Sequence, residues 1–241
     1  MIVLFTDFGL TDPYVGQIHA RLAQEAPGKP VIDLFHAVPG FDIRAGAYLL
    51  PAYARDFPPG TVLICVVDPG VGSARQPVMV RADGSWYVGP DNGLFHMLAR
   101  RARECETYAI RWRPIRLSAS FHARDLFAPV AASLARGDMP DSAPTTLTMP
   151  EGPAWPDDLA QILYIDHYGN GITGLRASSL SRNQRLKIRG QLLEHARFFA
   201  DVPPKTIFWY ENANGLIEVA ANQDSAAARL GLQIRDSVIL V

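Results

Sequence analysis

Residues 61–72 read Thr61-Val62-Leu63-Ile64-Cys65-Val66-Val67-Asp68-Pro69-Gly70-Val71-Gly72, an apolar run that ends in an aspartate, a proline and two glycines. Such a run is typical of a strand that is buried on both faces of a sheet. Open α/β sheets bind ligands beyond the carboxyl ends of their strands, so Asp68 stands where a ligand is expected. The glycines keep side chains away and let backbone amides approach that ligand.

A second apolar strand, residues 2–5, also ends in an acid and a glycine, in Thr6-Asp7-Phe8-Gly9. Two strands that bring carboxylates to the same sheet edge predict one crevice. Arg75 adds a fixed cation, and His122 adds a group that titrates near neutrality. Each residue alone has a structural alternative, as a turn former, a solvated arginine or a half-buried histidine. Together they form a catalytic set.

Strand and helix patterns alternate from residue 1 to about residue 140 and predict an N-terminal Rossmann-like α/β domain with a parallel, doubly wound sheet over 1–140. The expected strands are 2–6, 31–34, 61–67, 77–81 and 86–88, and the last two are expected to pair with each other around residues 82–85. The expected helices are 13–26, 44–57, 92–103 and 125–136.

Residues 138–158 are punctuated by prolines and predict a linker. The patterns beyond it are short strands, which predict a small C-terminal β-barrel or β-sandwich domain over 159–241. The expected strands there are 160–166, 172–175, 184–189, 206–210, 215–221 and 237–241, with one short helix over 226–230.

Composition narrows the class of protein. The chain has 241 residues, 48% of them hydrophobic, and a formal net charge of −1. This charge lacks the positive excess that is typical of nucleic-acid-binding proteins. No apolar run reaches the roughly 20 residues of a membrane span, and the opening strand lacks the basic flank of a signal peptide. Cys65 and Cys105 have no partner spacing for a disulfide or zinc. We expect a soluble cytoplasmic protein with no metal, no membrane partner and no nucleic-acid partner.

Six groups of residues, in this order along the chain, resemble the S-adenosylmethionine hydroxide adenosyltransferase family, the S-adenosylmethionine hydrolases, which are related to fluorinating and chlorinating enzymes. They are Thr6-Asp7-Phe8-Gly9 with Asp12-Pro13-Tyr14-Val15-Gly16, Val67-Asp68-Pro69-Gly70-Val71-Gly72 with Arg75, Val88-Gly89-Pro90-Asp91-Asn92-Gly93, Phe121-His122-Ala123-Arg124-Asp125, Asp166-His167-Tyr168-Gly169-Asn170, and Asn222. The resemblance implies hydrolysis of S-adenosylmethionine to adenosine and methionine, through attack of an activated water on the ribose C5′. This molecule is then the substrate, and no cofactor is implied.

The resemblance assigns catalysis to Asp68, Arg75 and His122. His122 and Asp68 would hold the water and take its proton, while Arg75 favours an ionised Asp68 or an incipient hydroxide. Asp7 would bind the ribose diol, with a turn or helix cap as the alternative. The other substrate-binding residues implied are Asp12, Tyr14, Phe41, Asp166, Tyr168, Asn170, Glu218, Ala221 and Asn222.

Several of these residues have a more specific role or an alternative one. Asp166 would hold the α-ammonium, while Tyr168 and Asn170 would contact adenine, although a plain turn also explains this segment. Ala221 and Asn222 would reach adenine through backbone groups. An outward-facing strand residue explains Glu218 equally well, and core packing explains Phe41.

Three alternative functions follow from the same substrate. The halogenating relatives have a tyrosine, a threonine and a serine where this chain has Asp68, Val71 and Ala123, so a halide-dependent adenosyl transferase is disfavoured. A methyltransferase would show a glycine-rich first loop, which residues 6–10 lack. A non-catalytic sensor of S-adenosylmethionine or adenosine would not need the catalytic set. The resemblance also implies a homotrimer in which neighbouring subunits share each site.

Overall fold

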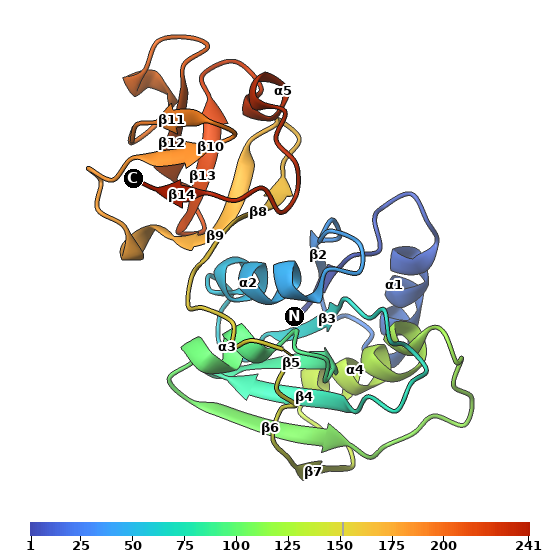
Figure 1. Ribbon diagram of the computed structural model, residues 1–241. Helices are drawn as coiled ribbons and strands as arrows, with labels where there is room; N and C mark the ends of the chain where they lie inside the picture. Colours follow the sequence, from blue (N-terminus) through green and yellow to red (C-terminus); the bar gives the residue numbers. More distant parts are fainter. Residues whose placement is uncertain (151) are drawn as a thin grey trace. The chain divides into compact units, whose positions relative to one another are not determined.

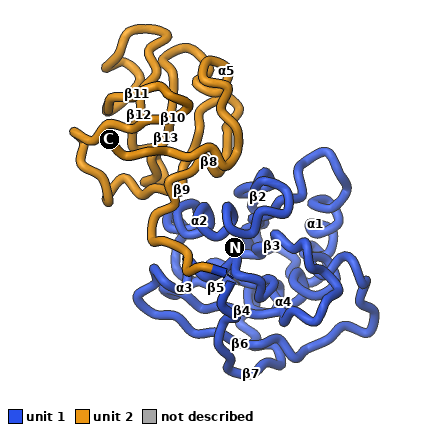
Figure 2. Tube along the Cα trace, viewed as in Figure 1, with its two compact units in different colours: residues 1–152 blue, residues 153–241 orange. Residues whose placement is uncertain are grey.

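The structure is a computed structural model that describes residues 1–150 and 152–241. The chain divides into two compact units, Met1–Gly152 and Pro153–Val241, which Figure 2 distinguishes by colour. Each unit has its own cluster of buried apolar side chains. The chain is thus a mixed α/β protein with several sheets and few helices.

The first unit is built on one seven-stranded sheet with the strand order β2-β1-β3-β5-β4-β6-β7 (Figure 1). Strands β2, β1, β3 and β5 are parallel, whereas β4, β6 and β7 are added antiparallel. Its strands are β1 (Ile2–Thr6), β2 (Val31–Phe35), β3 (Val62–Val66), β4 (Pro77–Ala82), β5 (Ser85–Pro90), β6 (Cys105–Ile110) and β7 (Ser142–Pro144).

The parallel order predicted for the sheet ends at β4, where the predicted pairing of residues 77–81 with 86–88 is confirmed as an antiparallel hairpin. Asp83 and Gly84 join β4 to β5, with backbone φ angles of 46° and 84°. Two successive positive φ angles are the conformation of a tight hairpin turn, which folds β4 back along β5. Strand β6 was not predicted, because it carries exposed and half-buried side chains rather than a buried apolar run. Strand β7 lies inside the segment that was expected to be a linker.

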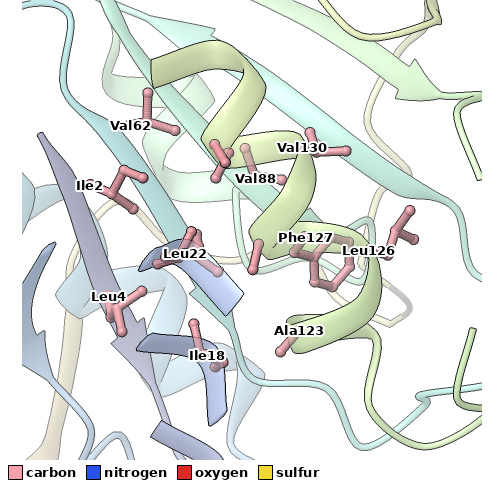
Figure 3. Packing of buried hydrophobic residues seen from close by; sticks show 14 of the residues in the cluster. Ile2, Leu4, Ile18, Leu22, Val62, Val88, Ala123, Leu126, Phe127 and Val130 are labelled. Atoms are coloured by element: carbon pink, nitrogen blue, oxygen red, sulfur yellow. The ribbon is translucent and has the colours of Figure 1, made fainter. Parts of the chain in front are cut away.

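Helices cover both faces of this sheet. They are α1 (Tyr14–Glu25), α2 (Ile43–Ala54), α3 (His96–Arg101), the π-helix η1 (Ala123–Phe127) and α4 (Ala128–Arg136). Ile2 and Leu4 of β1 belong to the cluster that contains Ile18 and Leu22 of α1 and residues of α4 (Figure 3). Phe5, the alternate residue, lies against Tyr53 of α2, with ring centroids 6.5 Å apart. Successive side chains of a strand point to opposite faces, so β1 is buried from both sides.

The second unit has two antiparallel sheets, in the orders β12-β13-β9-β8 and β11-β10-β14. Side chains from both sheets pack into one cluster around Trp209 and Ile217. In residues 153–241 the strands form these two separate sheets and not a closed barrel. The elements are β8 (Leu159–Ile165), β9 (Gly171–Arg176), η2 (Ala177–Ser179), β10 (Leu186–Ile188), β11 (Gln191–Leu193), η3 (Phe199–Asp201), β12 (Ile207–Glu211), β13 (Leu216–Ala221), α5 (Ala226–Leu230) and β14 (Ile239–Leu240).

Within residues 1–150 and 152–241, no helix has both the length and the apolar character that a membrane crossing requires.

Candidate active site

The structure brings the three predicted catalytic side chains together. Asp68 follows β3, and its carboxylate receives hydrogen bonds from Nε of Arg75 at 2.9 Å and from Nη2 of the same residue. Nη2 of Arg75 also lies 3.0 Å from Nδ1 of His122. The side chains of Asp68 and Arg75 are only 5% and 9% exposed. Charges in a buried pair interact more strongly than in water, so this pair has a fixed geometry.

The contact between Arg75 and His122 fixes the protonation pattern of the imidazole. A guanidinium has donors only, so Nδ1 of His122 accepts the hydrogen bond and carries no proton. The neutral ring then carries its single proton on Nε2. Burial, followed by the positive charge of Arg75, lowers the pKa of His122 below its ordinary value. His122 is thus a neutral ring with an N–H donor on its other side.

Two features of the neighbouring turns hold the trio of Asp68, Arg75 and His122 in place. Nδ2 of Asn92 donates to the carbonyl of Val67 at 2.8 Å and so anchors the turn that carries Asp68. Gly72 has a φ of 83°, and a Cβ there would lie 2.6 Å from the carbonyl oxygen of Ala119. Only glycine therefore allows the turn after Asp68 to approach the segment that leads to His122.

Asp68 and His122 border a pocket of about 390 Å³ in the first unit. Its lining includes six predicted residues: Asp7, Asp12, Tyr14, Phe41, Asp68 and His122. Arg75 is not part of the lining and acts on the pocket through Asp68 and His122. The side chain of Phe41 is 78% exposed, so it is not a core residue.

Aromatic rings form one wall of this pocket. Phe8, Tyr14 and Phe121 contact one another in pairs, with centroid separations of 5.8, 6.2 and 5.5 Å. Phe8 and Phe121 were quoted in the sequence motifs but were given no role. Their signal was present, since each adjoins a predicted polar residue, Asp7 or His122.

Asp7 has a structural partner as well as a place in the pocket. Its Oδ2 accepts a hydrogen bond from the backbone N–H of Phe41 at 2.9 Å. Burial, opposed by hydrogen bonds and reinforced by the nearby charge of Asp68, raises the pKa of Asp7. The carboxylate therefore both shapes the Phe41 loop and presents an acceptor to the pocket.

A chain of hydrogen bonds that runs from the buried Thr6 to the surface underlies the Asp7 turn and was not predicted. Oγ1 of Thr6 lies 2.7 Å from Nδ1 of His36, and Nε2 of His36 lies 3.0 Å from Oδ1 of Asp33. Nε2 of His19 also reaches Oδ1 of Asp33, at 2.8 Å. Oγ1 of Thr6 in turn accepts from the backbone N–H of Phe8 at 3.2 Å. The chain ties the end of β1, where Asp7 lies, to β2 and α1.

The second unit has a separate pocket of about 600 Å³. Five predicted residues line it: Asp166, Tyr168, Asn170, Glu218 and Ala221. Oδ1 of Asp166 accepts from the backbone N–H groups of Tyr168 and Asn170, at 2.9 and 2.8 Å, and its Oδ2 accepts from Nδ2 of Asn170 at 3.0 Å. This turn leaves the ring of Tyr168 75% exposed at the pocket.

Asn222 does not line the pocket. Its Nδ2 donates to the carbonyl of Val202 at 2.7 Å, and its backbone groups pair with Thr206 and Lys205. The structure thus gives these groups intramolecular partners, and the contact of Asn222 with adenine stays a prediction.

Glu218 is 5% exposed, so the interpretation as an outward-facing strand residue is wrong. The hydroxyl of Tyr210 donates to its Oε1 at 2.6 Å, and Nδ2 of Asn212 donates to its Oε2 at 3.0 Å. Burial raises the pKa of Glu218. Tyr210 and Glu218 are cross-strand neighbours of β12 and β13. The sequence showed both residues but not the register that joins them.

Two family models match this chain, one in each of its two compact units. Residues 2–143 match the SAM hydroxide adenosyltransferase N-terminal domain, and residues 160–239 match the SAM hydroxide adenosyltransferase C-terminal domain, where SAM is S-adenosylmethionine. This chain belongs to the SAM hydroxide adenosyltransferase family.

Relatives of this SAM hydroxide adenosyltransferase family member span nearly its whole length. The (R)-S-adenosyl-L-methionine hydrolase of Thermus thermophilus is 39% identical and is covered over 96% of both chains. That of Salinispora arenicola is 38% identical, over 97% of this chain and 94% of the relative. A crystal structure of an uncharacterized conserved protein from Thermotoga maritima superposes with a TM-score of 0.87 at 27% identity and complete coverage of both chains. A fluorinase of Actinoplanes sp. is 26% identical over 57% of this chain and 55% of the relative.

Some pocket residues of this SAM hydroxide adenosyltransferase family member were not predicted from its sequence. In the first unit they are Phe8, Gly40, Val66, Val71, Ser120, Phe121 and Ala123, and in the second unit Phe199, Tyr210, Asn212, Ala213, Asn214, Gln223 and Asp224. Phe8 and Phe121 adjoin predicted polar residues, and Val71 and Ala123 stand where the halogenating relatives have polar residues, so these four had a signal in the sequence. The other apolar and aromatic residues of the two pockets cannot be separated from core residues by sequence.

Proposed function

We propose that this protein hydrolyses S-adenosyl-L-methionine to adenosine and L-methionine. The observation that carries the proposal is the buried contact of Asp68, Arg75 and His122 beside the pocket of the first unit. Relatives at 38–39% identity are named hydrolases of this substrate. A binding protein would have no need of a buried acid and cation beside a half-buried neutral imidazole.

The reaction makes one demand on the protein. Water oxygen forms a bond to the ribose C5′, the bond from C5′ to sulfur breaks, and its electron pair leaves on sulfur as the neutral thioether of methionine. The leaving group needs no acid, so catalysis must position the water and remove its proton. No cofactor takes part in this scheme, because the sulfonium itself is the activated group.

The hydrogen bonds divide this work between two side chains. The Nε2–H of neutral His122 donates to the water oxygen and holds it in line with C5′. Asp68 accepts the water proton, since its oxygens keep acceptor capacity beyond the two bonds from Arg75. Arg75 keeps His122 in the tautomer that can donate. This scheme refines the expectation that His122 also takes the proton, because its free acceptor nitrogen is already used by Arg75.

The remaining contacts extend the proposal to binding. Asp7 accepts from the ribose hydroxyls, Asp12, Tyr14 and Phe41 border the sugar, and Asp166 with Tyr168 and Asn170 holds the methionine and adenine ends. The lining of the two pockets supports these roles. The names of the relatives specify the (R) configuration at sulfur, so we expect that epimer to be the preferred substrate here.

We further propose that three subunits assemble and that each substrate is held by the first unit of one subunit and the second unit of its neighbour. A closed ring of three heterologous contacts leaves no free face. We assign the first unit as a Rossmann-like domain and the second as a small β-sandwich. The parallel strands β2, β1, β3 and β5 and the two antiparallel sheets support this assignment.

One experiment distinguishes the candidate functions. The purified protein is incubated with each sulfonium epimer of S-adenosylmethionine, and the products are separated by chromatography. We expect adenosine and methionine in equal amounts, faster from the (R) epimer. S-adenosylhomocysteine would instead indicate methyl transfer, and unchanged substrate with measurable binding would indicate a sensor. Either result would refute the proposal.

A further inference from the structure

The turn that begins at Asp7 is held through its backbone by two buried residues. The N–H of Phe8 donates to Oγ1 of Thr6 at 3.2 Å. The N–H of Gly9, the next residue, donates to the carbonyl of His36 at 2.8 Å. Oγ1 of Thr6 in turn lies 2.7 Å from Nδ1 of His36, so the two acceptors are joined to each other. The conformation of the turn therefore depends on this pair of residues.

Asp33 sets the direction of the hydrogen bonds that lead to the turn. Burial raises the pKa of Asp33, but hydrogen bonds from His19 and His36 outweigh that effect and hold the pKa below its ordinary value. The ionised carboxylate can only accept, so Nε2 of His36, 3.0 Å from Oδ1 of Asp33, carries a proton and is the donor. In the neutral ring, Nδ1 of His36 then accepts from the hydroxyl of Thr6.

The burial of Thr6 favours this neutral ring. Thr6 is 0% exposed, and the side chain of His36 is 3% exposed. A doubly protonated ring would donate to Thr6, whose hydroxyl hydrogen would then have no acceptor among the residues that the structure describes. A buried donor without a partner is costly. Asp33, His36 and Thr6 thus form a hydrogen-bonded series with one direction, which ends at the N–H of Phe8.

This series reaches the substrate pocket through the turn. Asp7 and Phe8 both belong to the lining of the pocket in the first unit, whereas Thr6 and His36 do not. Oδ2 of Asp7 accepts from the N–H of Phe41 at 2.9 Å, so its carboxylate has a defined orientation. A shift of the turn would move this carboxylate relative to the pocket. Thr6 and His36 can therefore act on a bound substrate only through the residues that they hold.

We propose that Thr6, His36 and Asp33 form a positioning triad for ribose recognition, which holds the turn so that Asp7 can accept from both hydroxyls of the diol. This inference rests on the proposed function, in which Asp7 binds the diol. A contact that is ordered before the substrate arrives costs less conformational entropy on binding, so the positioning triad should add affinity for the ribose. The water and its proton have other partners, so the chemical step should depend on the triad little.

The main variant removes the hydroxyl of Thr6. Thr6→Val keeps the size of the side chain and deletes its hydrogen bonds to His36 and to the backbone. We expect KM for S-adenosylmethionine to rise about 5- to 30-fold, as for loss of a buried hydrogen-bond partner, with kcat within about threefold of the parent value. Thr6→Ser keeps the hydroxyl and should restore KM to within about threefold.

A second threonine provides the matched control. Thr61 is 1% exposed, and its hydroxyl donates to the carbonyl of Pro58 at 2.7 Å, just before the start of β3. It does not belong to the lining of the pocket. Thr61→Val therefore also deletes a buried hydrogen bond of the first unit, but away from the turn. It should lower the temperature of unfolding while leaving KM and kcat unchanged.

Two nucleosides measure the ribose contact directly. Adenosine carries the diol, and 2′,3′-dideoxyadenosine lacks both hydroxyls. In titration calorimetry the parent should bind adenosine at least about tenfold more tightly, and Thr6→Val should lose most of that preference. The double variant of Thr6→Val with Asp7→Asn should have a KM within about threefold of that of Asp7→Asn alone, because Thr6 acts through Asp7.

Three results would overturn the inference. The first is a normal KM and a full preference for adenosine in Thr6→Val that is folded by thermal unfolding. The second is an equal rise of KM in Thr61→Val, which would indicate a general loss of packing. The third is an additive effect in the double variant. If Thr6→Val does not fold, Asp33→Ala replaces it, since that side chain is 41% exposed. Its preference for adenosine should fall at least about threefold, and an unchanged preference would refute the triad.

The nucleoside comparison also separates this inference from the proposed function. If the parent prefers adenosine to the dideoxy compound but forms no adenosine from S-adenosylmethionine, the proposed hydrolysis fails. A loss of that preference in Thr6→Val would still establish the positioning triad. Equal binding of the two nucleosides by the parent would refute the diol contact of Asp7 and the triad with it, whether or not the substrate is hydrolysed.

Discussion

Nη2 of Arg75 donates a hydrogen bond to Nδ1 of His122 at 3.0 Å, so the arginine determines the tautomer of the histidine. A protonated imidazole could not accept this bond and would face a positive guanidinium. Burial and the charge of Arg75 lower the pKa of His122, so the ring stays neutral to a lower pH than an ordinary histidine does. We therefore expect the rate of the chemical step to depend on the protonation state of His122, which Arg75 influences.

The first prediction concerns that pH dependence. The acid limb of kcat should lie below the ordinary histidine pKa of about 6.5, because activity is lost only when His122 becomes protonated. The charge of Arg113 also lowers the pKa of His122. Arg113→Gln removes that charge, so the pKa should rise and the limb should move to higher pH, with the alkaline plateau unchanged. Arg116→Gln, an exposed arginine nearby in the chain, is the control and should leave the limb in place. An unmoved limb in Arg113→Gln would contradict the assignment to His122.

The second prediction concerns the trio itself. Asp68→Asn and His122→Ala should each lower kcat by about 100- to 10,000-fold, the range for a lost acid-base or water-holding group. KM should stay within about tenfold, since neither side chain is assigned a ground-state contact with the substrate. Steady-state kinetics with the (R) epimer gives both quantities. Near-normal turnover of His122→Ala between pH 6 and 9 would remove it from the mechanism.

The third prediction separates binding from chemistry at Asp7. Asp7→Asn should raise KM by about 10- to 100-fold, as for loss of hydrogen bonds to an ionised acceptor, and change kcat little. The pKa of Asp7 is raised, so this carboxylate becomes protonated at a higher pH than an ordinary aspartate. In the parent protein KM should therefore rise as the pH falls through that pKa. A variant with normal KM and reduced kcat would place Asp7 in the chemical step instead.

The fourth prediction concerns the nucleophile. Molar chloride should give no 5′-chloro-5′-deoxyadenosine, because Asp68 places a negative charge and Val71 and Ala123 place apolar groups on the pocket lining. Chromatography against a reaction without protein detects the product. Its formation above that background would show that a halide is tolerated beside Asp68.

The fifth prediction concerns assembly. Asp68→Ala and Asp166→Ala subunits, each inactive alone, should recover part of the activity when they are co-expressed, because mixed trimers contain some sites with both unmodified halves. Differential tags and native mass spectrometry would establish that the chains mix. Proven mixing without recovery would mean that each site is completed within one subunit.

The sequence predicted the strand ends well, for a physical reason. An apolar run that stops at an acid and a glycine marks both a buried strand and the sheet edge where ligands bind, so Asp7 and Asp68 were found from local pattern alone. Arg75 and His122 were found from their charge and titration chemistry and from the motifs around them, and the structure places them in contact. In these cases the functional side chain lies next to the sequence pattern that predicts a strand end or a turn.

Other features depend on pairings that a linear pattern does not contain. The bond between Tyr210 and Glu218 requires the register of two strands, and the bond between Thr6 and His36 requires two strands to be neighbours. Strand β6 begins with two exposed residues and has only one buried residue, so it shows no buried apolar run. In each case tertiary pairing, and not local preference, decides the outcome.

The division of the chain into two units with separate cores has a consequence for redesign. Asp68 and His122, which we assign to the nucleophile, belong to the first unit. Asp166, which we assign to the ammonium group of the methionine part, belongs to the second unit. Substitutions around Glu218 need not disturb the packing beneath Asp68. Specificity for the leaving group could therefore be changed by substitutions in the second unit, by design or by evolution. The residues of the chemical step in the first unit would stay as they are.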